Sequence, residues 1–175
     1  GDPKDKVDDL LSRRQENGGG ISTVFAHHTE KDMNYVLQKP WCSIGSDGSA
    51  YAIEGPLRVG NPHPRNFGTF PRVLGKYVRQ QKLLSLEDAI RKMTSLNANK
   101  VGLLDRGLIK IGFAADLAIF NAETVIDQST YTAPFAYPSG IRYVIVNGQL
   151  TIKNGEHTGV RAGRSLRKLV PSISR

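Results

Sequence analysis

Asp47 is the side chain best suited to chemistry in this sequence. It lies in Ser46-Asp47-Gly48, directly after residues 41–45, a short β-prone run that we predict to be a strand. In α/β sheets and barrels, ligand-binding and catalytic groups collect at the carboxyl ends of the strands. A carboxylate at such a place can bind a metal ion, hold a water molecule or transfer a proton during hydrolysis. The same three residues also form turns readily, so the local pattern alone leaves a purely structural turn open.

A stiff loop follows at Asn61-Pro62-His63-Pro64-Arg65. Its two prolines restrict the backbone and would present His63 and Arg65 in a fixed arrangement. The planar guanidinium of Arg65 can donate two parallel hydrogen bonds to a carboxylate. The pattern is equally compatible with a rigid surface loop whose arginine lies in solvent.

Histidine and cysteine are too scarce to indicate a complete metal site. The chain has four histidines and one cysteine, with no His-x-His pair, whereas a hydrolytic zinc site needs about three protein ligands. His27 and His28 end a predicted strand at residues 21–26, and adjacent residues point to opposite faces of a strand. At most one of them could therefore face a metal, and a packed histidine is the simpler interpretation. Cys42 is expected to be a small buried hydrophobe rather than a nucleophile.

The first part of the chain alternates strands and helices. Helices are predicted near residues 2–11, from Thr29 with Met33, Val36 and Leu37 on one face, from Thr69, and from Ser85. A Gly- and Pro-rich loop occupies residues 49–66, and unstructured loops of this length are usually functional. The order of elements favours parallel strands joined by crossover helices.

From about residue 105 onwards the pattern becomes β-rich and antiparallel. Strands are predicted at residues 115–120, 141–146 and 149–153, and Asn147-Gly148 and Asn154-Gly155 mark tight turns. The resulting fold class is α/β, with residues 1–104 and 105–175 as two parts. Two parallel strands cannot protect their faces and edges, so we expect either a larger barrel or pairing with another copy.

Composition excludes several classes of protein. No apolar run approaches the roughly 20 residues that cross a bilayer, so no membrane association is expected. The net charge of +8 invites nucleic-acid binding, but the basic C-terminal stretch lacks stacking aromatic residues, so a solvated basic face is expected instead. The single cysteine fits a reducing compartment, and we expect a cytoplasmic protein.

Several longer motifs resemble the D-aminoacylase (N-acyl-D-amino-acid deacylase) family of amidohydrolases. They are SDG at 46–48, HPRNFGTFPRVLGKYVR at 63–79, LSLEDAIRKMTSLNA at 84–98, GLLDRGLIKIGFAADLAIF at 102–120 and GIRYVIVNG at 140–148. The HPR-x-FGTFPRVLG run is specific to deacylases, whereas the AADLAIF and VNG pieces occur across the wider superfamily. The resemblance extends through nearly all of the chain from about residue 21.

The resemblance implies a fold and an activity. Members combine a (β/α)8 barrel with a small β-sandwich, so residues 1–104 would be the closing barrel units and residues 105–175 most of the sandwich. They use zinc to hydrolyse N-acyl-D-amino acids. By position, Asp47 matches the catalytic aspartate that activates the zinc-bound water and protonates the leaving nitrogen, and it is also a possible metal ligand. Arg65 matches the residue that holds the substrate's α-carboxylate, and His63 belongs to the same motif.

Some features depart from the family pattern. The upstream barrel with its zinc ligands is absent from this sequence, Asn97 stands where the family usually has proline, and His27-His28 replace an apolar pair. We therefore expect the chain alone to bind no zinc and to be catalytically silent. Two alternatives stay open, namely a non-catalytic remnant or structural module that self-associates, and a related cyclic-amide hydrolase. Pairing with a missing upstream segment would instead indicate a split enzyme. The stiff loop at residues 61–65, called the HPR loop below, argues against the second alternative, because it is a feature of the deacylases.

Overall fold

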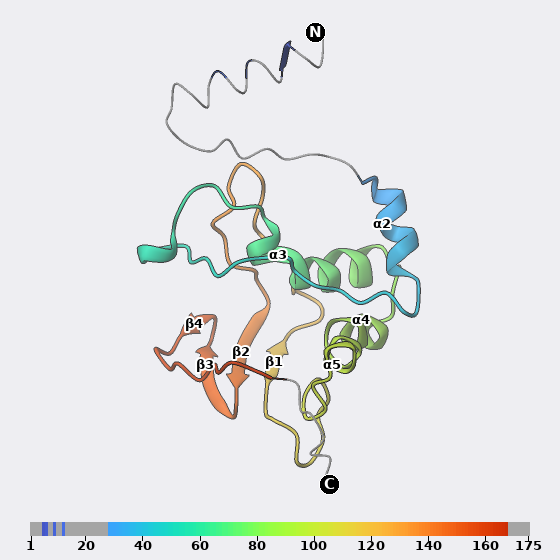
Figure 1. The fold of residues 1–175 in the computed structure, drawn as a ribbon, viewed down its shortest axis with the longest axis vertical. Helices are drawn as coiled ribbons and strands as arrows, with labels where there is room; N and C mark the ends of the chain where they lie inside the picture. The colour runs from blue at the N-terminus through green and yellow to red at the C-terminus, as the bar shows by residue number, and fades with distance from the viewer. Residues whose placement is uncertain (1–4, 7–8, 10–11, 13–27, 168–175) are drawn as a thin grey trace, which may run out of the picture. The chain divides into compact units, whose positions relative to one another are not determined.

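A computed structural model describes residues 5–6, 9, 12 and 28–167 (Figure 1). The chain forms two compact units, residues 1–33 and 34–175. The strand predicted at residues 21–26 and His27 lie outside the described residues, as does most of the predicted N-terminal helix. In the part of the chain that is described, no helix is long and apolar enough to cross a membrane.

Helix α2, Glu30–Leu37, begins with the predicted capping box. The Asp32 amide donates to Thr29 Oγ1 at 3.1 Å, and the Thr29 amide donates to the Asp32 carboxylate at 3.3 Å. Hydrogen bonds from the Thr29 side chain and backbone lower the pKa of Asp32. Of the apolar face predicted for this helix, Leu37 is buried, but Met33 and Val36 are 41% and 49% exposed. The helix is therefore anchored mainly through its last residue.

A longer helical stretch follows the loop and begins earlier than predicted. Helix α3 spans Arg65–Arg72 and continues into η2, a π-helix over Val73–Gln80. The prediction placed the start at Thr69 because proline favours the first turn of a helix. In the structure Pro71 lies inside α3, and the wider π-helical turns begin two residues after it. The HPR loop therefore runs directly into a helix, which fixes the backbone of Arg65.

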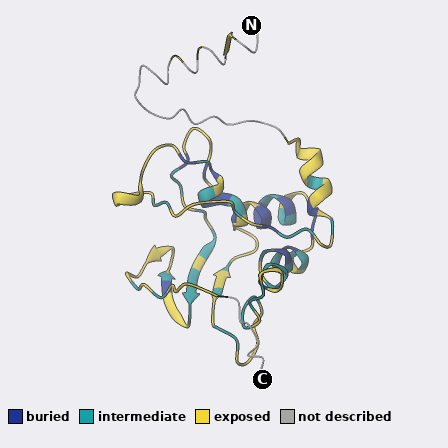
Figure 2. Cartoon of the chain, in the orientation of Figure 1, coloured by how far each residue is buried: buried dark blue, intermediate teal, exposed yellow. Residues whose placement is uncertain are grey.

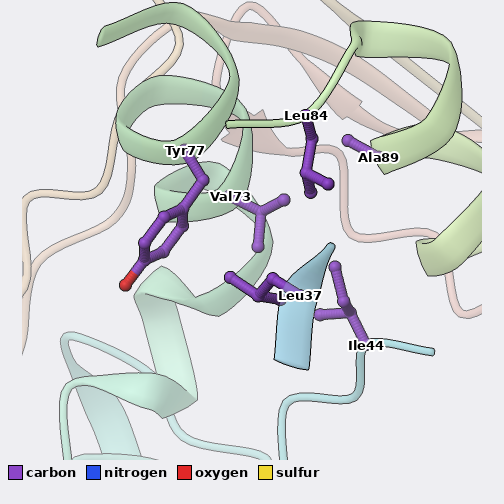
Figure 3. Close-up of a cluster of buried hydrophobic side chains, with 6 residues drawn as sticks. All are labelled: Leu37, Ile44, Val73, Tyr77, Leu84 and Ala89. Atoms are coloured by element: carbon purple, nitrogen blue, oxygen red, sulfur yellow. The ribbon is translucent and has the colours of Figure 1, made fainter. Parts of the chain in front are cut away.

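Two short helices, α4 at Leu86–Met93 and α5 at Ser95–Val101, complete the helical part. The predicted cap of α4 is confirmed, since Ser85 Oγ accepts a hydrogen bond from the Asp88 amide at 3.1 Å. The buried core lies between α4, η2, the end of α2 and the segment that precedes the SDG turn (Figure 3). It consists of Leu37, Ile44, Val73, Tyr77, Leu84 and Ala89.

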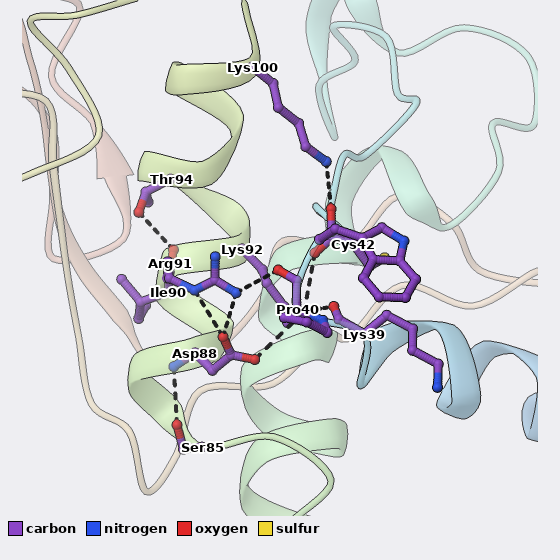
Figure 4. A network of polar contacts seen from close by, with 11 residues as sticks. Lys39, Pro40, Cys42, Ser85, Asp88, Ile90, Arg91, Lys92, Thr94 and Lys100 are labelled. Atoms are coloured by element: carbon purple, nitrogen blue, oxygen red, sulfur yellow. Dashed lines mark hydrogen bonds and ion pairs between the residues drawn. The ribbon is translucent and has the colours of Figure 1, made fainter.

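The strand predicted at residues 41–45 is wrong. Trp41 lies in a turn and residues 42–45 pair with no strand, because no neighbouring strand exists for them in the described part of the chain. Side chains of α4 and α5 instead bind carbonyl groups of residues 39–44 (Figure 4). Lys92 Nζ donates to the Lys39 and Cys42 carbonyls, and three further donors reach this segment: Arg91 to Pro40, Lys100 to Trp41 and Asn97 to Ile44.

We predict that Lys92→Met lowers the free energy of unfolding by about 2–3 kcal/mol. Lys92 is fully buried, and its ammonium group also lies 3.7 Å from the Asp88 carboxylate. The apolar replacement would fill a similar volume but would leave two carbonyl groups without their donor. Urea unfolding of Lys92→Met against Lys153→Met, an exposed lysine in a strand, measures the effect. Equal stability of the two variants would contradict it.

The second half forms a four-stranded antiparallel sheet in the order β1-β2-β3-β4. Strand β1 is Leu117–Phe120, β2 is Ile141–Val146, β3 is Gln149–Lys153 and β4 is Glu156–His157. The predicted Asn-Gly turns are confirmed, with positive φ at all four residues: Asn147 48°, Gly148 78°, Asn154 52° and Gly155 86°. Much of the sheet is exposed or half-buried (Figure 2).

The segment at residues 121–127 joins the helices to the sheet. Arg79 of η2 donates to the Val125 and Ala122 carbonyls at 2.7 and 3.0 Å, and Arg72 of α3 pairs with Asp127 at 2.7 Å. Gly75 lets η2 approach closely, since a Cβ there would meet the Val125 carbonyl oxygen at 2.7 Å. This contact places the chain that follows, residues 128–137, beside the HPR loop.

Candidate functional site

Asp47 lies in a backbone conformation that aspartate tolerates better than most residues. Its φ is 47°, in the left-handed region, and the next amide, of Gly48, donates to Ser46 Oγ at 3.3 Å. The left-handed backbone of the SDG turn is therefore at Asp47 and not at Gly48. Gly48 lets Asn66 approach closely, because a Cβ there would lie 3.1 Å from the Asn66 side-chain oxygen.

Asn66 connects the SDG turn to the HPR loop, and sequence reasoning missed it. Its side-chain oxygen accepts from the Ser49 amide at 2.6 Å, and its side-chain nitrogen donates to the His63 carbonyl at 2.7 Å. The only available signal was its position directly after Arg65. By bridging two segments 17 residues apart, Asn66 holds Asp47 and Arg65 in one neighbourhood.

Arg65 and Asp47 form an ion pair. Arg65 Nη1 lies 2.9 Å from Asp47 Oδ2, and the two side chains are 45% and 85% exposed. Exposed pairs of this kind contribute at most about 1 kcal/mol to stability, so a competing anion can separate them. The structure thus brings together the carboxylate and the guanidinium that the sequence predicted separately.

His63 is hydrogen-bonded through both ring nitrogens. The Arg65 amide donates to Nδ1 at 3.0 Å, and Nε2 lies 3.0 Å from the hydroxyl of Tyr131. Since Nδ1 accepts, the neutral ring carries its proton on Nε2 and donates it to Tyr131. The rings also meet edge-on, with centroids 5.0 Å apart. Tyr131 is 68 residues away along the chain, and nothing in its local sequence predicts this contact.

We predict that His63 titrates below its ordinary value of 6.5. Burial, and secondarily the charge of Arg65, lower its pKa. The unfolded chain therefore binds more protons just below pH 6.5, so the free energy of unfolding falls as the pH drops through this range. NMR titration of the His63 ring, assigned with His63→Gln, measures the midpoint. A midpoint at or above 6.5 would contradict this account.

The described residues do not form a zinc site. They contain no group of three or more His, Cys, Asp or Glu side chains placed to hold a metal ion. Near Asp47, the candidate donor His63 already uses Nδ1 for the Arg65 amide. Cys42 is half-buried rather than fully buried as predicted, with its thiol 3.7 Å from the Ser43 carbonyl. Asp47 could supply one carboxylate ligand, and zinc would need further ligands from elsewhere.

Comparison with known proteins identifies the family. The model of the amidohydrolase family matches residues 42–152, which include Asp47, Arg65, strands β1 and β2 and most of β3. The chain belongs to the amidohydrolase family. Within it, the chain is a partial homologue of the N-acyl-D-amino-acid deacylases, as the motifs suggested.

Two curated relatives come from Alcaligenes xylosoxydans xylosoxydans. An N-acyl-D-glutamate deacylase is 41% identical over 83% of this chain and 28% of its own length. An N-acyl-D-aspartate deacylase is 43% identical over 78% of this chain and 26% of its own length. The chain therefore spans little more than a quarter of the length of these amidohydrolases.

Solved structures agree with this assignment. A D-aminoacylase with a binuclear metal centre matches 78% of this chain and 27% of its own, at 42% identity and a TM-score of 0.70. An N-acyl-D-glutamate deacylase from Bordetella bronchiseptica, complexed with zinc and a phosphonate mimic of the tetrahedral intermediate, matches 70% of this chain and 24% of its own. Its identity is 39% and its TM-score 0.63. The helices and the antiparallel sheet thus correspond to part of a deacylase.

Proposed function

We propose that this chain is the part of an N-acyl-D-amino-acid deacylase that supplies the proton-transfer carboxylate and the binding site for the substrate's α-carboxylate. The observation that supports this most strongly is the contact between Asp47 and Arg65 at 2.9 Å. Hydrolysis of an N-acyl-amino acid needs one group that transfers a proton and one group that binds the substrate's α-carboxylate. A single substrate molecule must be able to reach both groups.

The chemistry follows from the two side chains. Arg65 binds the α-carboxylate of the substrate through its planar donors, which separates the guanidinium from Asp47. The freed Asp47 carboxylate accepts a proton from water as the water oxygen bonds to the amide carbon. Asp47 then gives this proton to the nitrogen as the carbon–nitrogen bond breaks. The products are a carboxylate and the free D-amino acid.

His63 and Asn66 position these groups. The hydrogen bond from the Arg65 amide to His63 Nδ1, at 3.0 Å, fixes the start of α3, and Asn66 fixes the SDG turn. Both residues act on the backbone of the site rather than on the substrate. In this proposal they hold Arg65 and Asp47 at a separation that one substrate can bridge.

Zinc ligands other than Asp47 come from the rest of the enzyme in this proposal, because the described residues offer no metal cluster. The helical part up to about residue 104 closes the barrel, and residues 105–175 belong to the β-sandwich. The segment between these parts carries exposed apolar side chains: Val101, Leu104, Leu108, Ile109 and Ile111, with the last two 92% and 101% exposed. Such a strip is suited to packing against the remaining chain.

A substrate comparison tests the proposal. The chain is combined with the remaining part of a D-aminoacylase and zinc, and given N-acetyl-D-methionine, N-acetyl-L-methionine and a hydantoin. We expect amine release from the D-compound in preference to the L-compound and no opening of the hydantoin ring. Hydantoin opening without deacylation would instead support a cyclic-amide hydrolase and overturn the proposal.

A further inference from the structure

An open pocket of about 440 Å³ lies between two loops. Arg58, Gly60 and Asn61 line it on one side, and residues 132–135 line it on the other. Its walls offer a guanidinium, an amide, a hydroxyl and the ring of Phe135. Neither the proton transfer nor the α-carboxylate binding proposed above uses any of these groups.

Arg58 is the only charged residue that lines this pocket. Its guanidinium carbon lies 4.2 Å from the centre of the Phe135 ring. Stacking on a ring leaves the donors at the edge of the guanidinium plane free. In the described part of the chain, no carboxylate lies within ion-pair distance of Arg58. The pocket therefore presents an uncompensated, planar cation.

Hydrogen bonds within the chain and one ring contact hold the pocket wall at residues 132–135. Ser129, only 3% exposed, donates through its hydroxyl to the Pro134 carbonyl at 2.6 Å. The Thr130 amide donates to the Ala133 carbonyl at 3.1 Å, and the Ala133 amide donates to Thr130 Oγ1 at 3.0 Å. The Phe135 ring packs edge-on against Phe67 of α3, with centroids 6.0 Å apart. The surface on which Arg58 stacks is thus fixed by α3, the helix that begins with Arg65.

The pocket adjoins the candidate site on both of its sides. Asn61 lies two residues before His63 in the stiff loop, and Thr132 follows Tyr131, whose hydroxyl lies 3.0 Å from His63 Nε2. A substrate bound at Arg65 through its α-carboxylate therefore has the pocket beside it. The side chain at its α-carbon is the group that can enter.

We propose that this pocket is the subsite for the substrate side chain and that Arg58 binds a carboxylate there. The inference rests on the proposed deacylase function and specifies its substrate class, the N-acyl derivatives of acidic D-amino acids. Arg65 and Arg58 then bind the two carboxylates of one dicarboxylic substrate. A substrate with a neutral side chain would leave the guanidinium of Arg58 without a partner. The pocket should therefore bind acidic side chains more tightly than neutral ones.

Calorimetric titration of the chain with N-acetyl-D-glutamate and with N-acetyl-D-glutamine tests the subsite directly. The two compounds differ in charge but hardly in shape. We expect the wild-type chain to bind the glutamate compound about tenfold more tightly, as one added charge-assisted contact at an open site allows. Arg58→Gln should bind both compounds equally, whereas Arg142→Gln, which removes an exposed arginine of the sheet, should keep the preference.

The remaining outcomes each overturn the inference. An unchanged preference in Arg58→Gln, equal binding of both compounds by the wild-type chain, or binding of neither would all do so, because the whole pocket lies within this chain. The reconstituted enzyme separates this result from the proposed function. Hydrolysis of both compounds at equal rates would reject the acidic subsite and leave the deacylase intact. No hydrolysis of any N-acyl-D-amino acid would reject the deacylase itself.

Discussion

Asp47→Asn is expected to reduce kcat of the reconstituted deacylase by at least about 10²-fold, because general acid–base catalysis contributes about 10²–10⁴-fold. The amide cannot accept the proton of the attacking water or return it to the leaving nitrogen. The change also removes the ion pair with Arg65, which leaves the guanidinium free for the substrate's α-carboxylate. KM should therefore stay constant or fall. Steady-state kinetics with an N-acetyl-D-amino acid measures both constants.

Asp105→Asn is the matched control for this prediction. Asp105 is also an aspartate near an arginine, with a half-exposed side chain 3.9 Å from Arg106, but it lies outside the candidate site. Its replacement should leave kcat close to the wild-type value. If Asp47→Asn and Asp105→Asn were equally active, the catalytic role of Asp47 would be rejected. Circular dichroism of both variants would confirm that each is folded.

Gly140→Ala is expected to destabilise the chain by more than about 2 kcal/mol, combining overpacking with an unfavourable backbone conformation. Gly140 has φ of 82°, and a Cβ there would lie 2.5 Å from both the Cα and the amide nitrogen of Val125. Val125 is fully buried, and its carbonyl binds Arg79 at 2.7 Å. The backbone at residues 121–127 would have to move, which loosens the contact between helices and sheet.

Gly163→Ala provides the control, because a Cβ at Gly163 would have no heavy atom within 4 Å. Urea unfolding of the two variants against the wild-type chain gives the difference in free energy of unfolding. We expect Gly163→Ala to match the wild type. A Gly140→Ala variant as stable as wild type would show that residues 121–127 are not the rigid connection described above.

Local patterns predicted the elements that depend on few residues. The caps at Thr29 and Ser85 and both Asn-Gly turns are correct, because each is determined within about four residues. The strand at residues 41–45 is wrong for the opposite reason. A strand requires a partner, and here the carbonyl groups are bound by helix side chains about 50 residues away, such as Lys92. The early start of α3 was hidden by the prolines on either side of it.

The candidate site was only partly predictable. Asp47 and Arg65 were selected from motif and residue type, and their direct contact follows from the fold. His63 was selected too, but its hydrogen bond to Tyr131 joins segments 68 residues apart, which no local pattern encodes. Arg58 lay inside a loop predicted only to be functional. Its importance emerges from the stacking on Phe135, which depends on residues 121–135 folding back onto α3.

The most direct test of the account measures amine release from an N-acetyl-D-amino acid by the purified chain with added zinc, alone and after addition of the remaining part of a D-aminoacylase. We expect no release by the chain alone and release once both parts are present. Asp47 and Arg65 come from this chain, and the other metal ligands come from the remaining part of the enzyme. Release by the chain alone would contradict this expectation, because the chain would then have to assemble a complete metal site of its own.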